Sequence, residues 1–228
     1  MSIKGILFDF NGTLFFDSHL HAEAFKRTFK AHGLPVPTTD FIASNIFGMQ
    51  NQHIYRKFYD PNATEQDIED FIEEKEGLYM DFFLEKNDNR LCDGAYDMLD
   101  YLKAHNIPYA IATGSEYKSV LFYIEHLGLD RWFTLDNIIY TNGTFRGKPY
   151  PDIYLLASER LGLRPEECAV FEDGCAGLTS AAEAGIGKRF AIYEKGIPSP
   201  LKNGITADGE YHDLTNWRNI LKDIGLLK

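Results

Sequence analysis

The feature that most constrains the fold is the segment from Gly5 to Leu14, with the sequence GILFDFNGTL. Its residues Ile6 to Phe8 are apolar without polar alternation, which is typical of a strand buried on both faces of a parallel sheet. Open parallel sheets bind ligands at the carboxyl ends of their strands, and Asp9 stands at that end. The segment therefore predicts an α/β fold with a carboxylate at the binding edge. An Asx turn after an ordinary strand is the alternative interpretation.

Two later apolar segments end in polar residues in the same way. The segment Tyr109–Ser115 ends in hydroxyl residues and a glycine, and a helical pattern follows it. The segment Cys168–Gly174 ends on the acidic pair Glu172 and Asp173. Because parallel strands bring their carboxyl ends to one edge of a sheet, we expect these polar residues to lie near Asp9.

Lys148 lies in a loop with Pro149 and Pro151, after the second strand-like segment and ahead of the helical pattern Ile153 to Leu161. A carboxylate such as Asp9 can attack a phosphate when a metal and a cationic side chain offset the repulsion between the two anions. Lys148 is a candidate for that cation. The hydroxyl of Thr113, with nearby helix N-terminal amides, is a candidate for binding phosphate oxygens. A lysine on a surface loop is the alternative interpretation of Lys148.

Two regions of the chain differ in their hydropathy pattern. From about Ser18 to Lys86 the pattern is helical without a buried strand, whereas from Asp93 onward helical segments alternate with short apolar strands. We therefore predict a doubly wound parallel sheet with an inserted α-helical cap domain. The predicted core comprises residues 1–16 and 88–228, and the predicted cap comprises residues 17–87.

Local signals predict three helices in particular. A helix from His19 to His32 ends at Gly33, because glycine readily adopts the left-handed conformation that follows many helices. The residues TEQD from Thr64 to Asp67 form a helix-start box ahead of apolar residues at helical spacing. A closing helix is predicted by the apolar residues Leu214, Trp217, Ile220, Leu221 and Ile224.

The composition favours a soluble cytoplasmic enzyme. The formal net charge of −11 argues against a nucleic-acid partner and against an anionic membrane surface. The sequence contains no run of about 20 apolar residues, so no membrane span is predicted. The N-terminus leads directly into the first strand, and we expect no signal peptide. Cys92, Cys168 and Cys175 lack zinc-ligand spacing and are expected to be reduced thiols, and Cys175 is either a reactive thiol or a small packing residue.

These motifs and their order resemble the haloacid dehalogenase superfamily, and within it the β-phosphoglucomutase-like and phosphoglycolate-phosphatase-like subgroup. The resemblance covers nearly the whole chain. It implies that Asp9 is the catalytic nucleophile and that Lys148 bridges it to the phosphate. It also implies that Thr113, together with the amide of Gly114, binds the transferred phosphoryl group.

The resemblance further implies a Mg²⁺ cofactor. Carboxylate and carbonyl oxygens are the ligands that Mg²⁺ uses in proteins, usually together with several waters. The positions that match the metal ligands of the family are Asp9, the backbone carbonyl of Asn11, Glu172 and Asp173.

Asn11 departs from the first motif of the family, which has a second aspartate two residues after the nucleophile. In relatives that aspartate protonates the leaving oxygen and later activates water, and an amide cannot exchange a proton in this way. Loss of a positioned acid–base group costs ~10²–10⁴-fold in rate. Four explanations are open: a slow phosphatase for good leaving groups, another acid–base group such as His19 or His21, a binding protein without turnover, or an engineered change.

His21 and Lys75 in the predicted cap resemble the histidine and lysine by which the subgroup couples cap closure to substrate binding. The alternatives are an exposed helix histidine and a lysine on a solvated helix face. The segment Gly48–Asn51 lacks the lysine of phosphonatases, and Asn51 stands where sugar-phosphate mutases have an arginine for the second phosphate. An amide does not replace a bidentate arginine, so a mutase is disfavoured.

We therefore predict a Mg²⁺-dependent phosphatase that forms an aspartyl phosphate on Asp9 and is slowed by Asn11. Its partner would be a small phosphorylated metabolite, such as a sugar phosphate, and the protein would be a monomer or a weak dimer. The alternative is a catalytically impaired protein that binds phosphate or a phosphorylated metabolite. Release of phosphate from an aryl phosphate in the presence of Mg²⁺ distinguishes the two.

Overall fold

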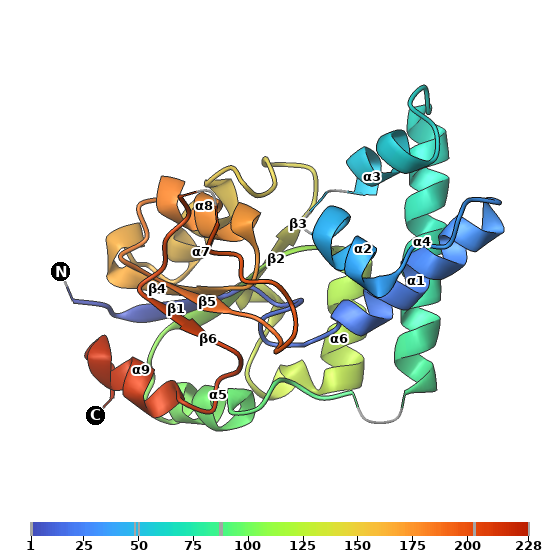
Figure 1. Ribbon diagram of the computed structural model, residues 1–228. Coiled ribbons are helices and arrows are strands. Elements are labelled where there is room, and N and C mark those ends of the chain that lie inside the picture. Colours follow the sequence, from blue (N-terminus) through green and yellow to red (C-terminus); the bar gives the residue numbers. More distant parts are fainter. Residues whose placement is uncertain (1, 48, 50, 87–88, 203, 228) are drawn as a thin grey trace. The chain divides into compact units, whose positions relative to one another are not determined.

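The computed structural model describes residues 2–47, 49, 51–86, 89–202 and 204–227 (Figure 1). The chain divides into two compact units, of which one comprises Met1–Phe16 with Arg90–Lys228 and the other comprises Asp17–Asn89. We call the first the sheet unit and the second the helical unit. The predicted domain boundary between residues 87 and 88 lies outside the described residues.

The sheet unit is built on a six-stranded parallel sheet with the order β3-β2-β1-β4-β5-β6. The strands are β1 (Gly5–Phe8), β2 (Tyr109–Glu116), β3 (Ile138–Thr141), β4 (Cys168–Glu172), β5 (Lys188–Ile192) and β6 (Gly209–Tyr211). The strand order runs away from β1 in one direction to β3 and in the other direction to β6. This is the doubly wound arrangement, and its switch point lies between β1 and β4. The predicted fold class is confirmed.

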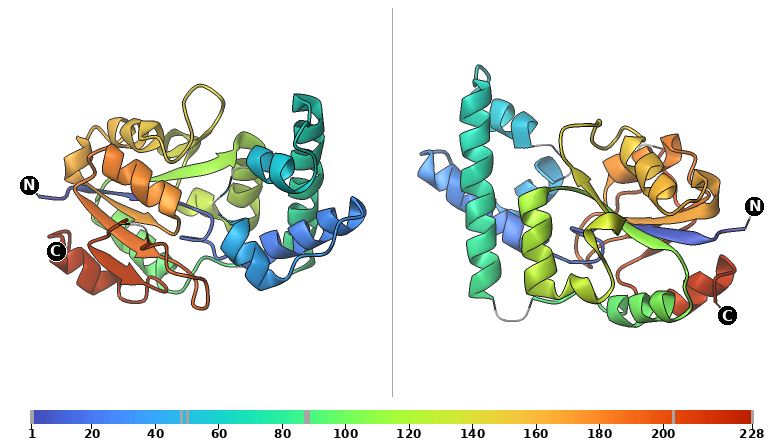
Figure 2. Two further views of the ribbon diagram at one scale, coloured as in Figure 1. Left: turned by 45° about the horizontal axis from the view of Figure 1, so that its top comes forward. Right: turned by 180° about the vertical axis from the view of Figure 1, so that it is seen from behind.

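Helices cover both faces of this sheet. They are α5 (Ala95–Ala104), α6 (Tyr117–Leu127), α7 (Asp152–Arg160), α8 (Cys175–Glu183) and α9 (Trp217–Asp223), with short 3₁₀ helices η1 (Leu129–Arg131), η2 (Leu135–Asn137) and η3 (Pro165–Glu167). Figures 1 and 2 show α7 and α8 over one face and α5 and α9 over the other. Leu7, Ala112 and Val170 of the strands pack with Ile153 and Ala181 of the helices in one buried cluster. This core fixes the strands whose ends carry the polar residues.

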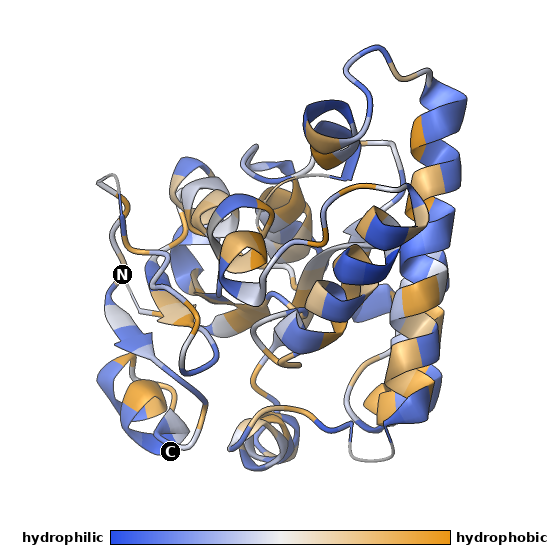
Figure 3. Cartoon of the chain, turned by 45° about the vertical axis from the view of Figure 1, so that its right-hand side comes forward, coloured by the Kyte–Doolittle hydropathy of each residue, from blue (hydrophilic) through white to orange (hydrophobic). Residues whose placement is uncertain are grey.

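The helical unit consists of α1 (Ser18–Ala31), α2 (Thr39–Asn45), α3 (Asn51–Phe58) and α4 (Glu65–Glu85), and its described residues include no strand. The start of α4 is the predicted one, because Thr64 Oγ1 accepts the N–H of Asp67 at 3.2 Å and Asp67 Oδ2 accepts the N–H of Thr64 at 2.8 Å. The long helix α4 carries both hydrophilic and hydrophobic residues along its length (Figure 3). Its apolar residues join a separate core that includes Phe25, Ile54 and Phe71.

The helix ends also follow the sequence signals. The helix predicted from His19 to His32 spans Ser18–Ala31, and Gly33 after it has a φ of +69°. The predicted closing helix is α9, in which Trp217 and Ile220 are buried. Among the described residues, no helix is long and apolar enough to cross a membrane.

Candidate active site

The carboxyl ends of β1, β2 and β4 lie side by side, because β1 pairs with both other strands. Phe8 pairs with Phe171, and the backbone N–H of Asp9 donates to the carbonyl of Phe171 at 2.9 Å. Asp9 therefore follows β1 beside the acidic residues Glu172 and Asp173 at the end of β4. Asp9 is 6% exposed and Glu172 is 2% exposed, so both side chains have lost most of their contact with water.

Lys148 links the first two of these carboxylates. Its Nζ donates to Asp9 Oδ1 at 2.6 Å and to Glu172 Oε2 at 2.7 Å. The lysine side chain is only 13% exposed, which contradicts the interpretation as a surface-loop lysine. The charge-assisted hydrogen bonds hold Lys148 over both acids, although the three residues are far apart in the sequence.

Glu172 is held by more than Lys148. The hydroxyl of Tyr154 in α7 donates to Glu172 Oε2, and the backbone N–H of Gly174 donates to Oε1 at 3.3 Å. Tyr154 is fully buried, and sequence reasoning missed it because a tyrosine at an apolar helix position resembles a core residue. The sequence feature that could have identified Tyr154 is its position on the buried face of the helix that follows Lys148.

The charges at this site are not balanced by Lys148 alone. Burial and the neighbouring charge of Glu172 raise the pKa of Asp9 to about 7, and Lys148 acts in the opposite direction. Burial alone would lower the pKa of Lys148, but Asp9 and Glu172 raise it well above its ordinary value. Lys148 therefore stays protonated, and a further cation at this site would favour the ionised form of Asp9.

Asp9, Glu172 and Asp173 each offer a carboxylate oxygen, and these oxygens lie within 4.8 Å of one another. Carboxylate oxygens are the ligands that Mg²⁺ uses, so these three side chains would hold the ion. When ionised, three carboxylates and one lysine carry three negative charges and one positive charge, a net charge that one divalent cation offsets. The residues present fit Mg²⁺ in ligand type, spacing and charge.

Gly12 brings the loop after Asp9 against Asp173. Its φ is +79°, and a Cβ at this position would lie 2.1 Å from Asp173 Oδ2. Only a glycine combines this backbone conformation with so close an approach. The loop after β1 and the loop after β4 are therefore in direct contact.

The side chain of Asn11 bonds to a residue near the end of β2 and to a residue of α6. Asn11 Oδ1 accepts from the hydroxyl of Ser115 at 2.8 Å, and Asn11 Nδ2 donates to the hydroxyl of Tyr123 at 3.1 Å. Sequence reasoning did not anticipate either partner. The two bonds use both ends of the amide, so Asn11 ties the loop after β1 to the end of β2 and to α6.

Thr113 and Gly114 lie at the end of β2, next to β1. Thr113 is 2% exposed, and its Oγ1 accepts the N–H of Ser115 at 3.1 Å. Gly114 is exposed, and a Cβ there would meet no atom within 4 Å. Both residues stand at the edge of the sheet that carries Asp9, and the space beside Gly114 leaves its backbone accessible.

Replacement of Gly177 by alanine is expected to disrupt the position of Glu172. Gly177 lies in α8, and a Cβ there would lie 1.9 Å from Glu172 Cδ. We expect a loss of ~1–3 kcal/mol in the free energy of unfolding, measured with urea, because the carboxylate must move in a packed interior. Gly77→Ala is the matched control: Gly77 lies in α4 with no atom near its Cβ position, and alanine there should stabilise the helix by ~0.5–1 kcal/mol. Equal effects of the two substitutions would contradict this account of Glu172.

In the helical unit, His21 and Lys75 contact each other. Lys75 Nζ lies 2.9 Å from His21 Nδ1 and donates to Glu76 Oε1 at 2.7 Å, and Lys75 is 3% exposed. Lys75 is therefore not on a solvated helix face. The other ring nitrogen, Nε2, faces Asp17 Oδ2 at 3.4 Å.

The positive charge of Lys75 is partly balanced by the neighbouring carboxylate of Glu76. Burial raises the pKa of Glu76, but the charges of Lys75 and His21 and hydrogen bonds from Lys75 and Asn51 outweigh it and lower that pKa overall. The hydroxyl of Tyr79 donates to Asp17 Oδ2 at 2.7 Å, and the ring of Tyr79 stacks on His21 at 4.4 Å between centroids. His21 and Lys75 thus belong to one connected polar group in this unit.

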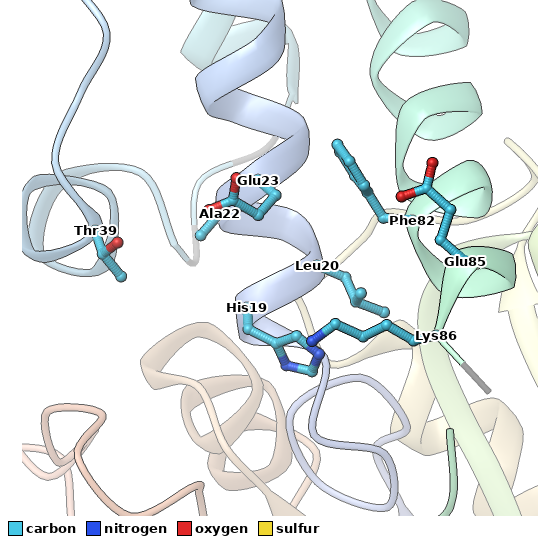
Figure 4. A pocket seen from close by; sticks show the side chains of 8 residues that line it. All are labelled: His19, Leu20, Ala22, Glu23, Thr39, Phe82, Glu85 and Lys86. Atoms are coloured by element: carbon cyan, nitrogen blue, oxygen red, sulfur yellow. The ribbon is translucent and has the colours of Figure 1, made fainter. Parts of the chain in front are cut away.

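The helical unit also has a pocket of about 270 Å³ beside α1 and α4 (Figure 4). It is lined by His19, Leu20, Ala22, Glu23, Thr39, Phe82, Glu85 and Lys86. All of these residues belong to the helical unit, whereas the acidic group around Asp9 belongs to the sheet unit. The pocket contains His19, one of the two histidines considered as a substitute acid–base group.

Comparison with known families gives a match over most of the chain. Residues 3–185 match the family described as haloacid dehalogenase-like hydrolase. The chain is 27% identical to the phosphorylated carbohydrates phosphatase of Thermotoga maritima over 194 residues, which cover 83% of this chain and 85% of the relative. It is 31% identical to hexitol phosphatase A of Escherichia coli over 185 residues, 81% of each chain.

Solved structures give the same result for the fold. A HAD hydrolase of family IA, variant 3, from Entamoeba histolytica is 35% identical, with a TM-score of 0.87 over 99% of each chain. A β-phosphoglucomutase from Clostridium difficile has a TM-score of 0.79 over 98% of this chain and 97% of the other, at 21% identity. At that identity the second similarity concerns the fold alone.

Proposed function

Because the chain belongs to the haloacid dehalogenase-like hydrolase family, we propose that it is a Mg²⁺-dependent phosphatase of a small phosphomonoester, such as a sugar phosphate. The observation that carries the proposal is the buried bridge from Lys148 to Asp9 and Glu172, with Asp173 beside it. The names of the relatives, a phosphorylated carbohydrates phosphatase and a hexitol phosphatase, support this substrate class. The chain is accordingly assigned as a phosphoric monoester hydrolase rather than as a mutase.

In the proposed mechanism, Asp9 attacks the phosphorus atom and the bond to the leaving oxygen breaks, which gives an aspartyl phosphate. Water then attacks this phosphorus atom, releases inorganic phosphate and regenerates Asp9. Lys148 offsets charge on the phosphoryl oxygens, and Thr113 with the amide of Gly114 donates to them. Mg²⁺, held by Asp9, Glu172, Asp173 and the carbonyl of Asn11, would supply further charge neutralisation.

Asn11 makes this reaction slow in the proposal. An amide neither donates a proton to a poor leaving oxygen nor accepts one from the attacking water. Both chemical steps lose acid–base assistance, and the second loses it for every substrate because it always uses water. Good leaving groups should therefore be released faster than the aspartyl phosphate is hydrolysed.

We also propose that His21 and Lys75 of the helical unit bind the substrate. The support is that Lys75 is 3% exposed yet keeps a charged group, with Glu76 as its acidic neighbour. Burial of an ammonium is unfavourable unless it is paired, and Lys75 is held at its buried position by His21 and Glu76.

The metal part of the proposal is tested by Asp173→Ala. Mg²⁺ at about 100 times its Kd should stabilise the parent protein by about 2.7 kcal/mol, and the variant should lose this gain. Glu69→Ala is the control, because Glu69 is an exposed acid on α4 of the helical unit. Thermal unfolding with and without Mg²⁺ measures both. An equal response of the two variants would show that the acidic pair is structural.

The second candidate function is a protein that binds phosphate without turnover, which the amide at Asn11 favours. Phosphate release from p-nitrophenyl phosphate with Mg²⁺ separates it from the phosphatase. Asp9→Asn serves as the control for contaminating activity, since it removes the nucleophile. Phosphate release by the parent and not by this variant supports the phosphatase, whereas stabilisation by phosphate without release supports the binding protein.

A further inference from the structure

Two tyrosines form an accessible aromatic surface at the carboxyl edge of the sheet. Tyr117 is the first residue of α6, directly after β2, and is 47% exposed. Tyr140 lies in β3, pairs with Thr113 and is partly exposed. The two ring centroids are 5.4 Å apart, with the ring planes at 37°. A single exposed apolar residue is ordinary, but two aromatic rings in contact beside a candidate active site form a surface that a ligand can use.

This aromatic surface lies within reach of a substrate bound at Asp9. Neighbouring strands are about 4.8 Å apart, and β3 is two strands from β1, so the backbone of Tyr140 lies about 10 Å from β1. Tyr117 directly follows β2, the strand that lies between β3 and β1. A ring of sugar size attached to a phosphate at Asp9 covers this distance.

Polar groups stand between the aromatic surface and the nucleophile loop. Ser115 donates its hydroxyl proton to Asn11, which lies two residues after Asp9. Glu116, the last residue of β2, is exposed and immediately precedes Tyr117. Its carboxylate is an acceptor, which suits a ligand that presents hydroxyl groups.

We propose that Tyr117 and Tyr140 form a platform for the uncharged, polyhydroxylated part of the substrate, with Glu116 accepting its hydroxyl groups. This proposal rests on the proposed phosphatase function and adds the class of leaving group. A sugar or sugar alcohol has C–H groups that pack on an aromatic face and hydroxyls that reach a carboxylate at its rim. A nucleobase can also stack on one exposed ring face, so it is the carboxylate of Glu116 beside the rings that favours a ligand with many hydroxyl groups.

Tyr117→Ala is expected to weaken the binding of sorbitol 6-phosphate and glucose 6-phosphate by ~3–10-fold, the effect of removing one aromatic contact. Calorimetric titration in the presence of Mg²⁺ measures this without requiring turnover. Tyr117→Phe should bind as tightly as the parent, because it keeps the ring. Leu121→Ala is the matched control, since Leu121 lies in the same helix and is 41% exposed. Glu116→Gln should weaken binding of both probes less than Tyr117→Ala does.

The hydrolysis of acetyl phosphate, which has no polyhydroxylated part, is measured alongside. A parent that binds both probes but releases no phosphate from acetyl phosphate would refute the phosphatase and leave the platform intact. Equal affinity of Tyr117→Ala and the parent for both probes, or no binding by the parent, would overturn the platform. The platform would also be overturned if Tyr117→Ala bound a nucleoside monophosphate more weakly than the parent does but bound the two sugar phosphates equally well.

Discussion

Asn11→Asp is expected to raise the steady-state turnover of p-nitrophenyl phosphate by ~10²-fold or more, because it supplies an acid–base group two residues from the proposed nucleophile. The nitrophenolate leaving group needs little protonation, so Asp9 can be phosphorylated in the parent. The parent should therefore release a burst of nitrophenol and then turn over slowly while the aspartyl phosphate accumulates. Rapid-mixing measurements on the two proteins side by side give the burst and the steady-state rate.

The contacts of Asn11 can accommodate this substitution. A carboxylate accepts from the Ser115 hydroxyl as the amide oxygen does, and the Tyr123 hydroxyl can turn to donate where it now accepts from Asn11. A melting temperature close to that of the parent should accompany the gain. Steady turnover in the parent with little gain in the variant would instead indicate another acid–base group, such as His21. Absence of any reaction in both proteins, with stabilisation by phosphate, would favour the binding protein.

Lys148→Met is expected to have the largest effect on stability. The substitution leaves Asp9 and Glu172 side by side without the ammonium that lies 2.6 Å and 2.7 Å from them. Removal of one member of a buried ionic group typically destabilises a protein by ~3–5 kcal/mol. Loss of a cation at the phosphoryl group should also reduce turnover by ~10²–10³-fold. Urea unfolding in the presence of EDTA measures the first effect.

The loss of stability in Lys148→Met should depend on pH with a defined sign. In the parent the pKa of Asp9 is about 7, and removal of Lys148 raises it further. Below about pH 7 Asp9 is protonated in both proteins, and above it only the variant retains the proton. The difference in unfolding free energy should therefore grow as the pH rises through about 7. Lys118→Met, at an exposed position of α6, is the control and should show no such slope.

A double variant tests whether the carboxylates are the cause. Adding Asp9→Asn to Lys148→Met removes one of the two neighbouring acids, so part of the lost stability should return. Additive losses from the two substitutions would mean that Lys148 contributes by packing rather than by charge.

The sheet and the acidic edge could be predicted because each depends on local sequence. An apolar strand buried on both faces needs a run such as Ile6 to Phe8, and a parallel sheet then brings its end beside Glu172. The start of α4 could likewise be predicted, because the capping residues Thr64 and Asp67 lie within four residues of sequence. The roles assigned to these residues in catalysis remain predictions.

Contacts between distant residues could not be predicted in this way. The bond from Tyr154 to Glu172 requires two elements to meet at a particular register, and the tyrosine alone resembles a core residue. The hydrogen bond from Ser115 to Asn11 depends on loop geometry in the same manner. Lys75 lies in a charged stretch of α4 that resembles a solvated face, and only tertiary packing places it inside.

The hydrogen bond from the N–H of Cys92 to the carbonyl of Leu14, 2.8 Å long, has a consequence for how the chain folds. Ile6 must find Tyr109 on β2, roughly a hundred residues later, and such distant pairing slows folding. The helical unit has a core of its own around Phe25 and Phe71, so it can form before the sheet closes. Once the helical unit has formed, its two ends lie close together. The chain between β1 and β2 that must still be ordered for these strands to pair is then about thirty residues long. The speed of sheet assembly should therefore depend on helices that contribute no strand to it.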